Sequence, residues 1–318
     1  MARASPPPPL PLIPEAELVQ GALLGHGGFS TVHRATWHAL PVALKSLRLE
    51  AGDATDAARR AFEREMQVLF HLRHPNIVPV FGVCHHSDSR VSLVEALAER
   101  GDLHALLHPP GGGGAPLPAA TALRMGLDIA RGLAHAHSKG VVHMDVKPAN
   151  VLRGEGDRLM LADFGLAQRV RASLPHTHTH SMQQSSAGGG GISGGHGWAG
   201  TVCYAAPEAL SGSEGSAGYG QPPCDVFSLG VVLWELCSGG QAPWRDKNLL
   251  QVIRAVDRGE RPALPAGVHA GLGALIVRCW AQAPGERPTA SDVVVQLAAL
   301  LAGLAPPAQG GGGGGGGP

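Results

Sequence analysis

Glycine and proline are clustered in this chain, and their clustering decides which segments can form regular structure. The 318 residues include 46 Gly and 26 Pro, a level that approaches that of low-complexity chains. Many of them lie in residues 1–14, 108–118, 185–197 and the tail that begins at Pro306. These stretches have too few apolar side chains to offset the entropy lost on ordering. We therefore expect a folded unit that carries flexible arms and inserts.

The domain boundaries follow from this distribution. Residues 1–17 are predicted to be a disordered proline-rich arm, and residues 305–318 a disordered glycine-rich tail. The folded unit is expected over residues 18–304, with a flexible insert at about residues 173–198. Since 44% of the chain is hydrophobic, the remaining residues can build a substantial core.

Composition excludes several classes of function. Lys and Arg number 25, as do Asp and Glu, so the formal net charge is zero and no nucleic-acid partner is expected. The five cysteines are far apart, which argues against a disulfide framework. No apolar run reaches the length of a membrane span, and the proline-rich amino terminus does not resemble a signal peptide. We expect a cytoplasmic protein without a membrane partner.

The apolar residues of the first third predict a small β-rich unit with one helix. Strand-like apolar runs occupy Leu18–Val32, His33–Leu47 and Val91–Val94. Apolar residues at helical spacing predict a helix over Ala57–Leu72.

The pattern after residue 118 is mostly helical. A helix is predicted over Ala119–His137, followed by Lys139 as a cation of the last turn and Gly140 as the C′ glycine. A second, strongly apolar helix is expected to begin at Asp225, whose side chain would act as its N-cap. Such a helix belongs in the middle of a helical lobe.

Several residues carry chemistry. The glycine-rich turn Leu24–Val32 leaves backbone N–H groups open to phosphate oxygens, and Lys45 ends an alternating strand that could reach the same phosphates. By itself such a lysine is more often a solvated edge residue. Glu65 could face that lysine, or it could pair with a neighbouring arginine.

A second polar group follows later in the chain. Asp145, Asn150 and Asp163 come after short apolar strands, and carboxylate and amide oxygens suit Mg²⁺ beside a nucleotide.

Taken together, these motifs resemble the protein kinase family over about Leu18–Leu304. They occur in the order that the family has: the glycine-rich loop, Lys45 in VALK, Glu65, His143–Asn150 (HMDVKPAN), Asp163–Gly165 (DFG) and Ala206–Glu208 (APE). The resemblance implies an α+β, two-lobed protein kinase fold. The small N-lobe would cover about residues 18–95, and the mainly helical C-lobe about residues 100–304.

The resemblance also implies an activity and its residues. The chain would be an ATP-dependent serine/threonine kinase that uses ATP and Mg²⁺ and phosphorylates protein substrates. Asp145 would be the catalytic base, Lys147 would stabilise the γ-phosphate, and Asn150 and Asp163 would bind metal. The implied ATP-binding residues are Leu24, Gly25, His26, Gly27, Gly28, Phe29, Ser30, Val32, Ala43, Lys45 and Leu152, with Glu65 as the salt-bridge partner of Lys45.

Further positions match structural residues of the family. Leu69, Val80, His143 and Phe164 resemble the stack that aligns the two lobes, although ordinary core packing explains them as well. Glu208 and Arg287 resemble a buried ion pair, and Asp225 resembles the residue that braces the catalytic loop. Lys147 together with the Cys279-Trp280 and Arg287-Pro288 ending is similar to tyrosine-kinase-like serine/threonine kinases.

Three positions depart from the family pattern. Ser30 replaces the third glycine of the loop. The gatekeeper, the residue at the back of the adenine site, is either Val94 or Glu95, and Val94 is preferred because a charge there is unusual. Met144 replaces the arginine that receives the activation-loop phosphate, so activity is predicted not to depend on that phosphorylation.

Other functions were weighed against catalysis. His176, His178 and His180 could chelate a metal ion, but a solvated insertion is the simpler interpretation. A pseudokinase scaffold with the same fold, or an interaction module, is the alternative function. Pseudokinases usually lose the equivalents of Lys45, Asp145 or Asp163, and this chain retains all three.

Overall fold

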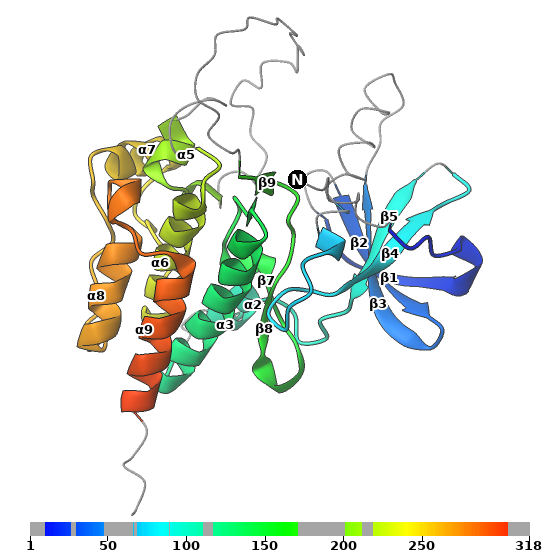
Figure 1. Ribbon diagram of the computed structural model, residues 1–318, viewed down its shortest axis with the longest axis horizontal. Coiled ribbons are helices and arrows are strands. Elements are labelled where there is room, and N and C mark those ends of the chain that lie inside the picture. The colour runs from blue at the N-terminus through cyan, green and yellow to red at the C-terminus, as the bar shows by residue number, and fades with distance from the viewer. Residues whose placement is uncertain are drawn as a thin grey trace, which may run out of the picture.

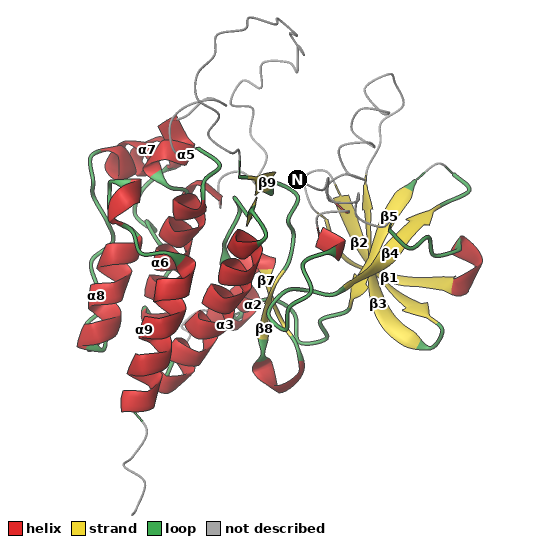
Figure 2. Ribbon diagram, in the orientation of Figure 1, coloured by secondary structure: helices red, strands yellow, loops and turns green. Residues whose placement is uncertain are grey.

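The structure is a computed structural model, and it describes residues 10–26, 30–47, 66, 69–88, 90–110, 117–170, 201–211 and 219–304. An antiparallel sheet forms one lobe and a group of helices forms the other (Figure 1). Coloured by secondary structure, the strands β1 to β5 gather at one end of the molecule and the long helices at the other (Figure 2). The α+β, two-lobed kinase fold predicted from the sequence is confirmed.

The sheet of the small lobe has five strands in the order β1-β2-β3-β5-β4. Their bounds are β1 (Leu18–His26), β2 (Ser30–Trp37), β3 (Leu40–Leu47), β4 (Val80–His85) and β5 (Val91–Ala96). The apolar run predicted from His33 to Leu47 was wrong in its boundaries, because it contains the end of one strand and all of the next. The chain reverses at His38 and Ala39, whose φ angles of 45° and 65° are those of a tight hairpin turn.

The segment before β1 packs onto the sheet, which corrects the boundary predicted at residue 17. Leu12 forms a parallel bridge with Val83 of the edge strand β4, where the Val83 N–H donates to the Pro11 carbonyl at 2.9 Å. Ile13 is buried in the outer hydrophobic cluster of the lobe. Apolar burial and pairing with an otherwise open edge order residues 10–17, and proline content alone does not reveal this.

The helix predicted over Ala57–Leu72 lies mostly outside the described residues, and so does Glu65. Met66, Leu69 and Phe70 are helical where they are described. Met66 and Leu69 are buried in the main hydrophobic cluster, as their spacing predicts.

The large lobe contains the remaining helices. Their bounds are α2 (Leu103–Leu107), α3 (Ala119–Ser138), α5 (Pro207–Ser211), α6 (Pro222–Cys237), α7 (Leu249–Asp257), α8 (Ala270–Cys279) and α9 (Ala290–Gly303). Helix α3 ends as predicted, with Lys139 as C-cap and Gly140 at φ 70°. None of the helices in the described part of the chain has the length and apolarity needed to cross a membrane.

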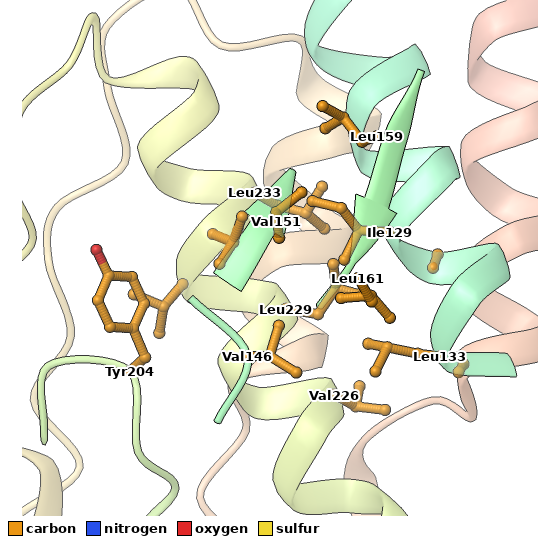
Figure 3. Packing of buried hydrophobic residues seen from close by; sticks show 14 of the residues in the cluster. Ile129, Leu133, Val146, Val151, Leu159, Leu161, Tyr204, Val226, Leu229 and Leu233 are labelled. Atoms are coloured by element: carbon orange, nitrogen blue, oxygen red, sulfur yellow. The ribbon is translucent and has the colours of Figure 1, made fainter. Parts of the chain in front are cut away.

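Helix α6 is the centre of this lobe. Figure 3 shows Val226, Leu229 and Leu233 of α6 against Ile129 and Leu133 of α3. The two helices can approach closely because α3 has a glycine where they meet: a Cβ on Gly126 would lie 2.4 Å from a methyl carbon of Leu233.

The predicted N-cap of α6 was wrong. The helix begins three residues earlier than expected, and its N-cap is Gln221, which makes no side-chain capping bond. Proline occupies the first helical position, where its missing N–H costs nothing. Asp225 therefore lies inside the first turn, and its carboxylate is available for contacts elsewhere.

Two small two-stranded antiparallel sheets lie between α3 and α5 in the chain. The first pairs β6 (Val141–Val142) with β9 (Gln168–Arg169), and the second pairs β7 (Val151–Arg153) with β8 (Leu159–Leu161). The segment 143–150 runs from β6 to β7, and Asp163 follows β8. This arrangement places the polar residues of both segments next to one another.

Candidate active site

One face of the small-lobe sheet carries the predicted nucleotide residues. Gly25 pairs with Val32 across β1 and β2, and Val32 pairs with Lys45 across β2 and β3. Ala43 is two residues from Lys45 and therefore shares its face. Among the described residues, no atom would lie within 4 Å of a Cβ on Gly25, so their packing does not require a glycine there and a ligand could approach its backbone.

The predicted adenine walls lie apart from the protein core. Val32, Ala43 and Leu152 belong to neither of the two hydrophobic clusters formed by the described residues. Val32 and Leu152 are partly exposed, and Ala43 has little exposed surface. Apolar side chains that the core does not use are what a flat apolar ligand requires.

The rest of the glycine-rich loop is only partly described. Leu24 and His26 lie in β1 and are exposed, and Ser30 begins β2. Gly27, Gly28 and Phe29 lie outside the described residues. Their contact with phosphate stays a prediction.

The preference for Val94 as gatekeeper was wrong. Val94 is fully buried in the outer cluster of the sheet, together with Val42 and Leu44. Glu95 pairs with Ala43 across β3 and β5 and therefore lies on the face that carries Lys45. Strand alternation places adjacent residues on opposite faces, and the register, which the sequence does not specify, decides between them.

The environment of Glu95 perturbs its ionisation. Burial raises the pKa of its carboxyl from 4.5 to about 7, while the charge of Lys45 opposes this rise and that of Asp163 adds to it. The charges of Lys45 and Asp163, both in the predicted nucleotide site, therefore affect the ionisation of Glu95.

Lys45 and Asp163 form a charged hydrogen bond between the lobes. Desolvation alone would raise the pKa of Asp163, but Lys45 outweighs it, and the pKa lies below its ordinary value. The Gly165 N–H also donates to the Asp163 carboxylate, at 3.3 Å. Because Glu65 lies outside the described residues, its salt bridge with Lys45 stays a prediction.

Asp145 has one carboxylate oxygen held and one left open. Lys147 Nζ lies 2.7 Å from Oδ2, and the Asn150 side-chain amide donates to the same oxygen at 2.8 Å. The other oxygen, Oδ1, is buried and has no hydrogen-bond partner among the described residues. Such an acceptor is costly in a folded protein, and it could accept a hydrogen bond from a ligand hydroxyl.

The loop that carries Asp145 is braced by Asp225, as predicted. The backbone N–H groups of His143 and Met144 donate to the two Asp225 carboxylate oxygens, each at 2.8 Å. Met144 has a φ of 67°, a strained value for a residue with a side chain. These two bonds hold that conformation, and His137 contacts the same carboxylate at 2.8 Å.

Of the predicted stack between the lobes, the contact between His143 and Phe164 is present. The rings of His143 and Phe164 lie 4.4 Å apart between centroids. Leu69 and Phe164 belong to the main hydrophobic cluster, and Val80 packs against it. The side chains that align the site are therefore part of the core itself.

The predicted ion pair between Glu208 and Arg287 is also present. It is bidentate, with N–O distances of 2.6 and 2.9 Å, and both side chains are almost completely buried. The pair connects α5, at the end of the segment from DFG to APE (residues 163–208, the activation segment), to the rest of the large lobe.

The oxygen atoms of Asn150 and Asp163 suit Mg²⁺. Their side chains follow β6 and β8, and hard oxygen ligands are those that Mg²⁺ prefers. The described residues contain no group of three or more His, Cys, Asp or Glu side chains that could hold a metal, so a metal here would need substrate oxygens as further ligands. The histidines at 176, 178 and 180 lie outside the described residues.

The sequence analysis did not find a series of polar contacts that runs from Lys147 of the catalytic loop to His108 at the end of α2. Lys147 also donates to Thr201 Oγ1 at 2.9 Å. Three residues later, the Tyr204 hydroxyl donates to Glu235 at 2.8 Å, and Glu235 contacts His108 at 2.6 Å. The signal for Glu235 was a charged residue near the end of the long apolar run that follows Asp225 in α6.

The chain is similar to known protein kinases over most of its length. Residues 18–297 match the family model described as protein tyrosine and serine/threonine kinase. Serine/threonine-protein kinase CTR1 of Arabidopsis thaliana is 33% identical over 93% of this chain and 33% of its own length. The probable serine/threonine-protein kinase drkD of Dictyostelium discoideum is 32% identical over 89% of this chain and 20% of its own length.

A human relative gives the same result. Mitogen-activated protein kinase kinase kinase 7 of Homo sapiens is 32% identical over 86% of this chain and 40% of its own length. The chain thus spans less than half the length of these curated relatives. It belongs to the protein tyrosine and serine/threonine kinase family.

Proposed function

We propose that this chain is an ATP-dependent serine/threonine protein kinase and that residues 18–304 form its catalytic domain. The observation that carries the proposal is the open Oδ1 of Asp145, beside the ordered Lys147 and Asn150. A catalytic base requires a carboxylate oxygen that is free to accept the hydrogen bond of a substrate hydroxyl.

The reaction follows from the positions of the charged groups. When bound, ATP with Mg²⁺ supplies the transferable γ-phosphate and the cation that neutralises developing charge. Lys45 would hold the α- and β-phosphates, and Asn150 and Asp163 would hold the metal. Val32, Ala43 and Leu152 would enclose the adenine.

Asp145 would act on the protein substrate. Its Oδ1 would accept the hydrogen bond of the substrate hydroxyl and then its proton as the oxygen attacks phosphorus. Asn150 and Lys147 hold the other oxygen, so the carboxylate does not need to reorient during the reaction. Lys147, which also contacts Thr201, would neutralise the charge of the phosphoryl oxygens.

The expected acceptors are serine and threonine. Lys147 resembles the lysine of serine/threonine kinases, and the relatives named above carry serine/threonine kinase names. Their names also suggest a position in a signalling cascade for this chain.

Phosphate transfer tests the proposal directly. Purified protein is incubated with Mg²⁺, labelled ATP and a generic basic protein, and the labelled amino acids are identified. We expect phosphoserine and phosphothreonine, with labelling abolished by Asp145→Asn, by Lys45→Met and by chelation of Mg²⁺. Equal labelling by the wild type and Asp145→Asn would overturn the catalytic assignment, and phosphotyrosine as the main product would overturn the acceptor class.

A further inference from the structure

Glu235 is a completely buried carboxylate in an apolar helix. Its side chain has no exposed surface, and it lies in α6, whose other residues nearby are apolar. Burial raises the pKa of Glu235, and its hydrogen bonds with His108 and Tyr204 oppose the rise. A buried charge without partners is strongly destabilising. The contacts with His108 and Tyr204 therefore stabilise the Glu235 carboxylate in its buried position.

Each oxygen of Glu235 has a separate partner. Oε1 lies 2.6 Å from His108 Nε2, and Oε2 accepts the Tyr204 hydroxyl at 2.8 Å. His108 is the C-cap of α2 and is mostly buried. The contact therefore joins the end of α2 to α6, and Glu235 in turn joins α6 to Tyr204.

Tyr204 extends the path to the catalytic loop. Its backbone carbonyl accepts a hydrogen bond from Ser228 Oγ at 2.8 Å, so both ends of the residue are held by α6. The Tyr204 N–H donates to the Thr201 carbonyl at 3.0 Å. The Thr201 hydroxyl in turn contacts Lys147, the partner of Asp145.

A protein substrate whose hydroxyl reaches Asp145 would lie next to the segment Thr201–Tyr204. A hydroxyl that reaches Asp145 Oδ1 has Lys147 and Thr201 as close neighbours. Tyr204 lies at the edge of the hydrophobic cluster of the large lobe, with its hydroxyl directed away from the labelled core residues (Figure 3). The nucleotide residues Lys45 and Asp163 take no part in this path.

We propose that His108 is a positioning residue for the protein substrate. Its ring holds Glu235, which holds Tyr204 and so keeps the segment Thr201–Tyr204 seated beside Asp145. This role rests on the proposed kinase function. His108 does not touch the reacting atoms, and it acts through Glu235.

Loss of the contact between His108 and Glu235 is expected to change KM for the protein substrate. Without His108, Oε1 of Glu235 is unpaired in the core, and the carboxyl either takes up a proton or draws Tyr204 away from its place. A hydrogen bond to a charged group corresponds to roughly tenfold in an equilibrium constant. We expect KM for the protein substrate to rise about tenfold, while KM for ATP stays unchanged.

The test compares three substitutions in the full chain. His108→Leu removes the donor at similar volume, and His108→Gln supplies an amide nitrogen in place of Nε2. His104→Leu is the matched control, since His104 lies on the same helix and its ring touches that of His108, at 4.6 Å between centroids. We expect the higher KM for His108→Leu alone, with recovery in His108→Gln.

A second readout separates this role from the kinase function. Hydrogen exchange of the amides in 201–204 is expected to accelerate in His108→Leu, and that of the amides in 143–146 is not. If the wild type transfers no phosphate, the proposed function fails, and the exchange result still decides the role of His108. If His108→Leu does not fold, His108→Asn, whose amide reaches less far than that of Gln, replaces it.

Three results for His108→Leu would each overturn the proposal. These are an unchanged KM for protein substrate in His108→Leu, an equal rise in KM for ATP, and unchanged exchange of 201–204. Equal effects in His104→Leu, or no recovery in His108→Gln, would also overturn it, because the cause would then be helix packing.

Discussion

Replacement of Glu95 by glutamine is expected to stabilise the protein above pH 7. Glu95 lies on the nucleotide face of the sheet, opposite Ala43. Burial raises the pKa of its carboxyl from 4.5 to about 7 despite the nearby charge of Lys45. Glutamine keeps the shape and polarity of the protonated acid and removes its charge.

The direction of the effect follows from proton linkage. The folded state binds the Glu95 proton more tightly than the unfolded state does. The protonated carboxyl therefore contributes to the free energy of unfolding, and this contribution is fully present below pH 4.5. It is lost as pH rises through about 7. At about 1.4 kcal/mol for each pH unit between the two pKa values, the loss amounts to about 3 kcal/mol at pH 8.

Urea unfolding without nucleotide or Mg²⁺ measures this directly. The free energy of unfolding is determined at pH 5, 6, 7 and 8 for the wild type, Glu95→Gln and Glu99→Gln. Glu99 is the matched control, because it is four residues away and its side chain is 64% exposed. We expect Glu95→Gln to gain on the wild type as pH rises and Glu99→Gln to follow the wild type.

The reasoning would be refuted by a constant difference between Glu95→Gln and the wild type from pH 5 to pH 8. A wild type that gains on the variant as pH rises would also refute it. Either result would mean that Lys45 compensates fully for the burial of Glu95. The same variant also serves as a control for nucleotide binding. Above pH 7 the charged Glu95 of the wild type lies beside Lys45 and affects the nucleotide affinity, whereas Glu95→Gln has no charge at this position.

Three further predictions test packing and regulation. Arg287→Met leaves Glu208 buried without its partner, and calorimetry should show destabilisation by about 3–5 kcal/mol; a cost below about 1 kcal/mol would contradict the burial of the pair. Gly132→Ala puts a Cβ 2.6 Å from the Asn76 carbonyl oxygen and should destabilise by about 1–3 kcal/mol in urea, whereas Gly285→Ala, with open space around it, should not. Met144 has no cation for an activation-loop phosphate, so phosphatase treatment should leave kcat unchanged; activity lost with phosphate and regained on rephosphorylation would contradict this.

Local patterns predicted most of the elements for identifiable reasons. Helix α3 has both an apolar stripe and a terminal glycine, so its sequence contains its own start and stop. The end of α6 that carries Asp225 was misassigned because an aspartate before an apolar run has the same local pattern whether it caps the helix or braces a distant loop. The bonds from His143 and Met144 to Asp225 join residues far apart in sequence, and no local rule anticipates them.

The segment before β1 shows the same limit. Residues 10–14 include two prolines and no helical or alternating pattern, so composition predicts an arm. The open edge of β4, almost seventy residues later in the chain, provides the partner for Leu12 and the pocket for Ile13.

By itself, the sequence determined which chemical groups this protein has. Asp145, Asn150 and Asp163 were found because polar residues after apolar strands form a local pattern that spacing reveals. The tertiary structure decided which groups meet: Glu95 rather than Val94 faces Lys45, and His108 reaches Glu235. Strand register and helix packing are set by contacts between distant segments, and the energy of those contacts depends on every residue that shares the core.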